Sequence, residues 1–128
     1  MEAAFDIDNM YCGVIERGDI FLYESKKGEK AVVVLQDNVL NEGLSTIVCA
    51  ILEPREKGDH VFANEVLLVA AENGLGVDAL CKLYKIETLD RRGIIAKKGE
   101  LSSERLFDIY RALDINCGRF RDNIMDLD

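Results

Sequence analysis

The residues of this chain best suited to chemistry on phosphate groups lie around one tight turn, in the segment "ESKKGEK" at positions 24–30. Lys27 and Lys30 carry ammonium groups that can bind phosphate oxygens. Glu29, between them, carries a carboxylate that can accept a proton. The same residues are also ordinary in a solvent-exposed hairpin turn. Two interpretations therefore stay open: a site that handles phosphate, or a plain structural turn.

Other familiar catalytic and metal-binding patterns are missing from the sequence. His60 is the sole histidine and lies in the charged segment 53–60, where we expect a surface position without a catalytic partner. The four cysteines are widely spaced and form no C-x-x-C pair, so we expect no metal site and no cofactor. Cys49 and Cys81 lie in apolar runs and are predicted to be small core residues.

The charge of the chain limits its choice of partners. It has 24 acidic and 16 basic residues, a net charge of −8 and an isoelectric point near 4.7. Such a surface repels nucleic acid on average, so any nucleic-acid role must depend on a local basic patch. The cluster of Lys26, Lys27 and Lys30 is one candidate. An acidic surface suits a basic protein partner equally well.

The hydrophobic pattern predicts that the elements around the turn are strands. Segments 19–24, 30–36 and 45–52 are apolar and rich in β-branched residues. The segments 25–29 and 37–43 are polar and are predicted to be connections. Three consecutive strands with short connections form an antiparallel meander.

The second half of the chain supplies further predicted strands. Segment 61–69 is expected to be a strand, with a helix as the alternative near 65–71. The Asn-Gly pair within 72–76 indicates a turn. Segment 80–89 is predicted to be a fifth strand, and 94–96 to add a short edge.

The clearest predicted helix spans residues 103–115. Ser102 is a suitable N-cap, and Leu101 and Leu106 occupy the positions of a hydrophobic staple. An apolar stripe with helical spacing follows, formed by Leu106, Ile109, Tyr110 and Leu113. Together, these elements predict an α+β fold, a small antiparallel β-barrel or curled sheet with one C-terminal helix.

Length and composition predict a single domain over residues 1–128, with flexible ends at about 1–15 and 119–128. No apolar run approaches the roughly 20 residues that span a bilayer. The start of the chain is acidic and lacks the layout of a signal peptide. We therefore expect no membrane association and a cytoplasmic location.

Four segments, taken in order, resemble the MazF/PemK family, the toxins of bacterial type II toxin–antitoxin systems. They are "RGDIFLY", "AVVVLQDN", "STIVCAIL" and "KIETLDRRGIIAKKGELSSERLFDIYRAL", and together they run from Arg17 to Leu113. The resemblance implies an SH3-like barrel with a C-terminal helix, assembled as a homodimer. It also implies a metal-independent endoribonuclease that cleaves single-stranded RNA and pairs with a cognate antitoxin.

The resemblance also suggests site residues, although this chain departs from the family pattern. Lys30 stands where the family has an arginine, Ala31 where it has a proline, and Leu52 where a threonine or serine is expected. A lysine keeps the positive charge but not the bidentate fork of arginine. The implied catalytic residues are Lys30 and Glu29. The implied RNA-binding residues are Arg17, Lys27 and Arg55.

Three hypotheses for function follow. The first is a working ribonuclease toxin, in which Lys30 stabilises the charge of the phosphorane and Glu29 acts as the base. The second is a catalytically degenerate MazF-like dimeric module that acts through protein contacts, favoured by the replaced residues and the acidic charge. The third is an unrelated small barrel with a similar order of strands.

Overall fold

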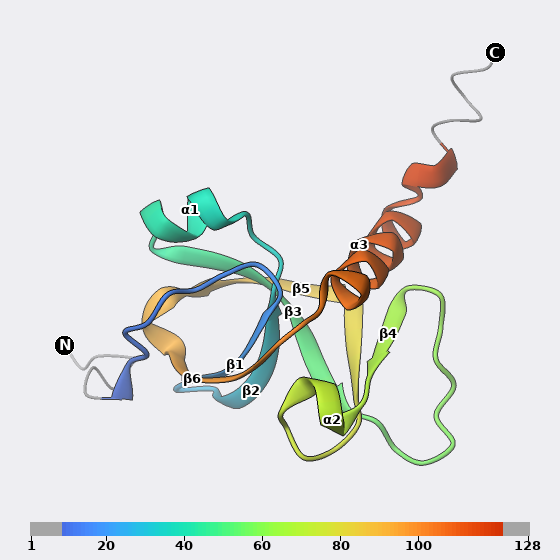
Figure 1. Cartoon of the computed structure of the whole chain (residues 1–128), viewed down its shortest axis with the longest axis horizontal. Helices are drawn as coiled ribbons and strands as arrows, with labels where there is room; N and C mark the ends of the chain where they lie inside the picture. Colours follow the sequence, from blue (N-terminus) through green and yellow to red (C-terminus); the bar gives the residue numbers. More distant parts are fainter. Residues whose placement is uncertain (1–8, 122–128) are drawn as a thin grey trace.

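A curled antiparallel sheet of six strands forms the body of the protein (Figure 1). The computed structural model describes residues 9–121. The strands are β1 (Asp19–Ser25), β2 (Gly28–Val34), β3 (Thr46–Pro54), β4 (Glu65–Leu68), β5 (Ala79–Asp90) and β6 (Ile94–Glu100). They lie in the order β4-β5-β3-β2-β1-β6, so the sheet is a half-barrel with β4 and β6 at its edges. With the C-terminal helix, this arrangement confirms the predicted α+β fold class.

The β1–β2 hairpin presents the residues of the candidate site. Tyr23 pairs with Lys30 and Ser25 pairs with Gly28, which leaves Lys26 and Lys27 as the turn. The backbone of Gly28 has a positive φ of 115°, a conformation that glycine adopts at little cost. The predicted hairpin is therefore confirmed, although β2 begins and ends two residues before the predicted strand.

Side chains of the sheet bury two separate apolar clusters, one on each face. Successive residues of a strand point to opposite faces, so a fully apolar strand can contribute to both. In β2, Val33 belongs to the first cluster, whereas Val32 and Val34 belong to the second. The first cluster packs under the C-terminal helix through Ile109 and Ala112.

Strand β6 completes the sheet by pairing with β1, and it is longer than predicted. Asp19 is in register with Glu100, and Tyr23 with Ile94, so the two strands pair along most of their length with two irregularities. The expected short edge over 94–96 was wrong in its extent. The pairing partner lies far away in the sequence, so no local pattern indicates where β6 ends.

The segment 37–43 was predicted to be a plain connection, but most of it is the short helix α1 (Asn38–Gly43). The Asp37 carboxylate accepts a hydrogen bond from the backbone N–H of Val39 at 3.2 Å and so caps the helix. Only Asn41 in this helix is buried, where it exchanges hydrogen bonds with Gln36. With so few apolar residues on one face, the helix has no periodic signal in the sequence.

The C-terminal helix α3 (Ser103–Cys117) confirms the clearest prediction. The Ser102 hydroxyl accepts a hydrogen bond from the backbone N–H of Arg105 at 3.2 Å, as expected of an N-cap. Tyr110 donates from its hydroxyl to the Leu35 carbonyl at 2.6 Å and so ties the helix to the sheet. Gly118, in the left-handed conformation, ends the helix, and a 3-10 turn follows at Arg119–Arg121.

The helix α2 (Ala70–Asn73) connects the two edges of the half-barrel. It follows β4 and packs against β6, where a Cβ on Gly74 would overlap the carbonyl oxygen of Lys98. Asn73 is fully buried and locks the following turn: its amide donates to the carbonyls of Leu68 and Val77 at 2.8 and 2.9 Å. Its side-chain oxygen accepts from the N–H of Leu75 at 2.7 Å.

Two sequence predictions between β3 and β6 can be compared with these elements. The strand predicted over 61–69 is confirmed only at Glu65–Leu68, and the helical alternative near 65–71 is wrong over those four residues and overlaps α2 only at 70–71. The predicted fifth strand is confirmed as β5. The turn after it is a 3-10 turn at Arg91–Gly93.

The part of the N-terminal segment that the structure describes packs against the second cluster. The Tyr11 backbone N–H donates to the Ile94 carbonyl at 2.8 Å, and its ring meets the Phe21 ring edge-on at 4.9 Å. Ile15 is buried. The rest of the predicted flexible N-terminal end, residues 1–8, and most of the C-terminal one, residues 122–128, lie outside the described residues. No helix among residues 9–121 is long and apolar enough to cross a bilayer.

Candidate functional site

Lys30 is the third residue of β2, and it makes the shortest ion pair of the candidate site. Its Nζ is 2.5 Å from the Oε2 of Glu87 on β5 and 5.8 Å from the centre of the Tyr23 ring. The side chains of Lys30 and Glu87 are 31% and 46% exposed, so solvent reaches both partners. The ammonium group is therefore accessible, but a carboxylate of the same chain already occupies one side of it.

The groups beneath this ion pair are held in their neutral forms. Cys49 is in register with Glu87 and is fully buried, and burial is the main reason that its pKa rises to about 12. Burial also raises the pKa of Tyr23. Cys49 is thus a neutral thiol near neutral pH and not a nucleophile.

Three separate pockets follow one another through shared lining residues, and we term this set of pockets the Lys30 groove. The first has a volume of about 510 Å³ and is lined by Tyr23, Lys26, Lys27, Lys30 and Glu87, among others. The second, of about 550 Å³, shares Lys30 with the first and contains Glu29 and Glu53. The third, of about 480 Å³, shares Val77 with the second and contains Arg55. The lining residues of the three pockets thus extend from the hairpin turn to the loop after β3.

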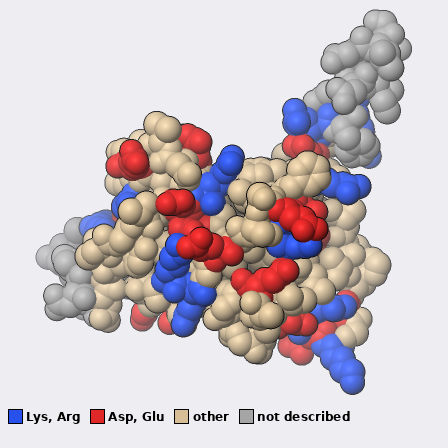
Figure 2. Space-filling view, viewed as in Figure 1, with Lys and Arg blue, Asp and Glu red and all other residues tan. Residues whose placement is uncertain are grey.

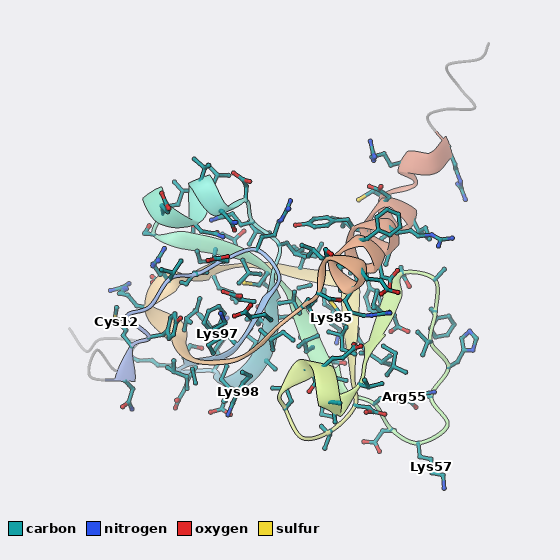
Figure 3. All side chains as sticks on the ribbon, viewed as in Figure 1. Cys12, Arg55, Lys57, Lys85, Lys97 and Lys98 are labelled. Carbon is teal, nitrogen blue, oxygen red and sulfur yellow. The ribbon has the colours of Figure 1, made fainter. Side chains whose placement is uncertain are left out.

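Four of the five predicted site residues line this groove. Lys27 and Lys30 share the first pocket, and Glu29 shares the second with Lys30. Within residues 9–121, the Glu29 carboxylate has no hydrogen-bond or ion-pair partner. Arg55 lines the third pocket and donates from Nη2 to the Asp59 carbonyl at 2.9 Å. Figure 3 shows Arg55 in the loop after β3, with Lys57 extending outward from the same loop.

Arg17, the fifth residue, lies outside the groove. It precedes β1, at the opposite end of that strand from the hairpin turn. Its guanidinium carbon lies 5.5 Å from the centre of the Tyr110 ring on α3, and its backbone N–H donates to the Asn38 side chain at 2.6 Å. The structure therefore places Arg17 with α1 and α3, and it does not bring Arg17 together with Lys30.

Sequence reasoning missed Glu53. Leu52 was aligned with the threonine or serine of the family pattern, but its side chain lies in the first apolar cluster. The next residue, Glu53, borders the same pocket as Lys30 and Leu52, and it brings a charged group there. Lys82 and Lys85 bind the Glu53 carboxylate at 2.6 and 2.7 Å, and their hydrogen bonds lower the pKa of Glu53.

The charges of the groove are balanced. Its basic residues are Lys26, Lys27, Lys30, Arg55 and Lys57. Its acidic residues are Glu29, Glu53, Glu56, Asp78 and Glu87. A similar mixture of basic and acidic side chains covers the face of the molecule in Figure 2. An anion in the groove is therefore attracted by individual cations and not by a broad positive field.

A further pocket, of about 620 Å³, lies between β4 and α3, away from the hairpin. Arg105 in this pocket already pairs with Asp108 at 2.6 Å and lies 3.7 Å from Glu72. With Glu104 at 3.3 Å, three carboxylates thus surround that arginine. Sequence patterns did not indicate this pocket, and it contains none of the predicted site residues.

The described part of the chain contains neither a catalytic partner for His60 nor a cluster of metal-ligating side chains. The exposed His60 packs its ring edge-on against Phe62 at 4.7 Å, which confirms its predicted surface position. Among residues 9–121, no three side chains of His, Cys, Asp or Glu gather in a way that could hold a metal ion. The chemistry available in the groove is that of ammonium, guanidinium and carboxylate groups, together with the hydroxyl groups of Tyr23, Ser25 and Thr88.

Comparisons with known proteins agree with this architecture. The chain is 28% identical to the endoribonuclease MazF of Staphylococcus epidermidis, over 82% of this chain and 92% of that protein. Its fold matches a mycobacterial endoribonuclease solved in complex with its cognate antitoxin, with a TM-score of 0.69, 19% identity, and coverage of 81% of this chain and 95% of that one. It also matches a MazE–MazF structure from Deinococcus radiodurans, with a TM-score of 0.66, 21% identity, and coverage of 83% and 97%.

A family model provides the broadest match. The model of the PemK-like, MazF-like toxins of type II toxin–antitoxin systems matches residues 16–116, which include all six strands and most of α3. The matched region begins just before β1 and contains the whole Lys30 groove. The chain therefore belongs to the PemK-like, MazF-like toxin family of type II toxin–antitoxin systems.

Proposed function

We propose that this chain is the toxin of a toxin–antitoxin pair and acts as a metal-independent endoribonuclease on single-stranded RNA. The observation that carries the proposal is the Lys30 groove, in which Lys30 and Glu29 are neighbouring residues that both border one pocket, the first with a solvent-accessible ammonium group and the second with a carboxylate that has no partner among residues 9–121. The 28% identical MazF relative is named as an endoribonuclease, which supports the same reaction. Groups of this kind suit cleavage at a ribose 2′-hydroxyl.

In this proposal, Glu29 and Lys30 have complementary roles. Glu29 accepts the proton of the 2′-hydroxyl as its oxygen attacks the adjacent phosphorus. Lys30 stabilises the negative charge that develops on the phosphorane oxygens. A lysine provides this charge from a single point, so we expect slower cleavage than from a site with a bidentate arginine.

Lys27 and Arg55 bind neighbouring phosphates at the two ends of the groove. An acidic protein needs such local contacts, because its overall field opposes RNA. Arg17 lies outside the groove, and we propose that it contacts only RNA that extends beyond it.

The proposed assembly is a homodimer that binds a cognate antitoxin in the cytoplasm. Mycobacterial and Deinococcus proteins of the same fold are described in complexes with their antitoxins. The net charge of −8 favours a partner whose contacting segment carries basic residues.

Incubation of the purified protein with long single-stranded RNA tests the reaction. The assay is run at low salt with a metal chelator, and compares wild type with Lys30→Ala and with Lys98→Ala, a control that removes an exposed lysine of β6 outside the groove. We expect cleavage by wild type and Lys98→Ala, and at least a hundredfold slower cleavage by Lys30→Ala. Absence of cleavage by wild type, or equal rates for Lys30→Ala, would reject the proposed roles.

The ion pair between Lys30 and Glu87 favours a second candidate, a catalytically degenerate dimeric module that acts through protein contacts. The charge of Lys30 is balanced by Glu87, and position 52 holds a buried leucine that cannot form a hydrogen bond. Both features argue against RNA cleavage. Induced expression in a bacterial host separates the two candidates. Growth arrest that a neighbouring small gene relieves would contradict the degenerate module.

A further inference from the structure

We infer that Glu87 is an internal competitor of RNA phosphate at Lys30 and sets the affinity of the groove for single-stranded RNA. The inference rests on the proposed function, because it assumes that Lys30 binds a phosphate of the RNA. It assigns Glu87 a role in the affinity for RNA, distinct from the roles proposed for Glu29 and Lys30 in cleavage.

The geometry places a carboxylate where a phosphate would bind. The Oε2 atom of Glu87 lies 2.5 Å from the Nζ of Lys30, which is a distance at which a phosphate oxygen would also bind an ammonium group. Within residues 9–121, Glu87 is the one carboxylate that pairs with Lys30. A phosphate that binds Lys30 must therefore displace this carboxylate or share the ammonium with it.

The order of the strands explains how the two residues meet. Lys30 belongs to β2 and Glu87 to β5, and β3 lies between these strands in the sheet. The Lys30 side chain thus extends across β3 toward Glu87, close to the buried Cys49. The pair also bounds the first pocket, together with Lys27. Glu87 therefore lies inside the groove and not on a remote surface.

Exposure makes the exchange of partners feasible. Both side chains are at least 30% exposed, and ion pairs open to solvent contribute little to stability. A phosphate can thus replace the carboxylate without unfolding the hairpin. While Glu87 remains charged, it holds Lys30 and also repels the approaching phosphate.

The neighbouring carboxylate of Glu53 serves as a contrast. It also lines the groove, but Lys82 and Lys85 bind its two oxygens. Its charge is therefore balanced by lysines that have no role in the proposed reaction. Only Glu87 takes its cation from the proposed catalytic residue.

Binding of a fluorescent, 2′-O-methylated single-stranded oligonucleotide, measured by anisotropy at low salt, tests the inference. This probe lacks the 2′-hydroxyl and cannot be cleaved, so binding is measured independently of catalysis. The variants are Glu87→Gln, Lys30→Gln and their combination. Glu42→Gln is the matched control, because Glu42 is exposed on α1 beyond the opposite end of β2 and its substitution changes the net charge equally.

We expect Glu87→Gln to bind the probe about fourfold to tenfold more tightly than wild type, from the loss of one unit charge about 5 Å from the phosphate. Glu42→Gln should bind within about twofold of wild type, because salt screens distant charges. In the Lys30→Gln background, the gain from Glu87→Gln should fall below about twofold. A Glu87→Ala variant should reproduce the gain of Glu87→Gln.

Unchanged or weaker binding by Glu87→Gln would overturn the inference, as would a gain that persists in full without Lys30. Thermal unfolding of each variant checks that the fold is intact. If wild type binds the probe but cleaves no RNA, the proposed reaction fails while the inference on Glu87 stands or falls on the binding data alone. If no variant binds the probe, the inference is wrong.

Discussion

Replacing Asn73 by alanine should destabilise the protein more than its small change in volume suggests. The fully buried side chain makes three hydrogen bonds to backbone groups of the residues around it. Its removal leaves two carbonyls and one N–H without their partner. Each unsatisfied group costs about 1 kcal/mol or more, so we expect a loss of about 3 kcal/mol in the free energy of unfolding.

The corresponding shift in melting temperature can be estimated from the length of the chain. An unfolding entropy of about 2.1 cal/mol/K per residue, applied to 128 residues, converts 3 kcal/mol into a decrease of about 11 °C. Calorimetry and urea unfolding followed by circular dichroism both measure the effect. Asn116→Ala is the control, because Asn116 accepts a hydrogen bond only from the exposed side chain of Asn64 and should change the free energy by less than about 0.5 kcal/mol.

The same substitution has a predicted consequence for the groove. Asn73 holds the backbone of Leu75 and Val77, and these two residues line the pocket next to Lys30. Loosening them should weaken binding of single-stranded RNA even at temperatures where the protein stays folded. A melting temperature within about 3 °C of wild type would refute the reasoning, because the three bonds would then contribute almost nothing.

Two further predictions concern titratable groups. Hydrogen bonds from two lysines lower the pKa of Glu53, so its contribution to stability is present above its unfolded pKa of about 4.3 and is lost as the pH falls through the lower folded pKa. Urea unfolding should therefore show Glu53→Gln less stable than wild type at pH 7, by less than about 1 kcal/mol. The difference should shrink as the pH falls below about 4.3 and through the lowered folded pKa, and a difference that stays constant into strong acid would contradict this. The thiols of Cys49 and Cys81 are buried, and the pKa of each is raised to about 12. They should react with a thiol reagent at pH 8 only after denaturation, whereas the two exposed cysteines should react in the native protein. Rapid labelling of all four cysteines in the native protein would contradict the burial of Cys49 and Cys81.

Local signals in the sequence predicted the elements that carry most of the site. The hairpin is specified by a polar turn with Gly28 between two apolar runs, and α3 by its N-cap and its apolar stripe. Both signals act between residues that are close in sequence. Helix α1 has neither an apolar stripe nor a buried apolar residue, so the polar segment 37–43 was predicted to be a connection.

The details of the groove depend on contacts between distant segments. Lys30 and Glu87 meet across an intervening strand, and no spacing in the sequence indicates that pair. The different roles of Leu52 and Glu53 depend on the register of β3, because a shift of one residue would exchange the side chain that enters the apolar cluster for the one that binds Lys82 and Lys85. The family pattern suggested the general region, and the alternation of the strand decided the residue.

The pairing of β1 with β6 implies an order of events during translation. Asp19 is among the earliest sheet residues to leave the ribosome, but its neighbour in β6 is Glu100, so the nascent chain holds β1 with one edge unpaired until β6 has been synthesised. A ribosome that stalls within β5 would therefore carry an incomplete half-barrel. Closure of the sheet edge at β1 therefore waits until β6 has left the ribosome.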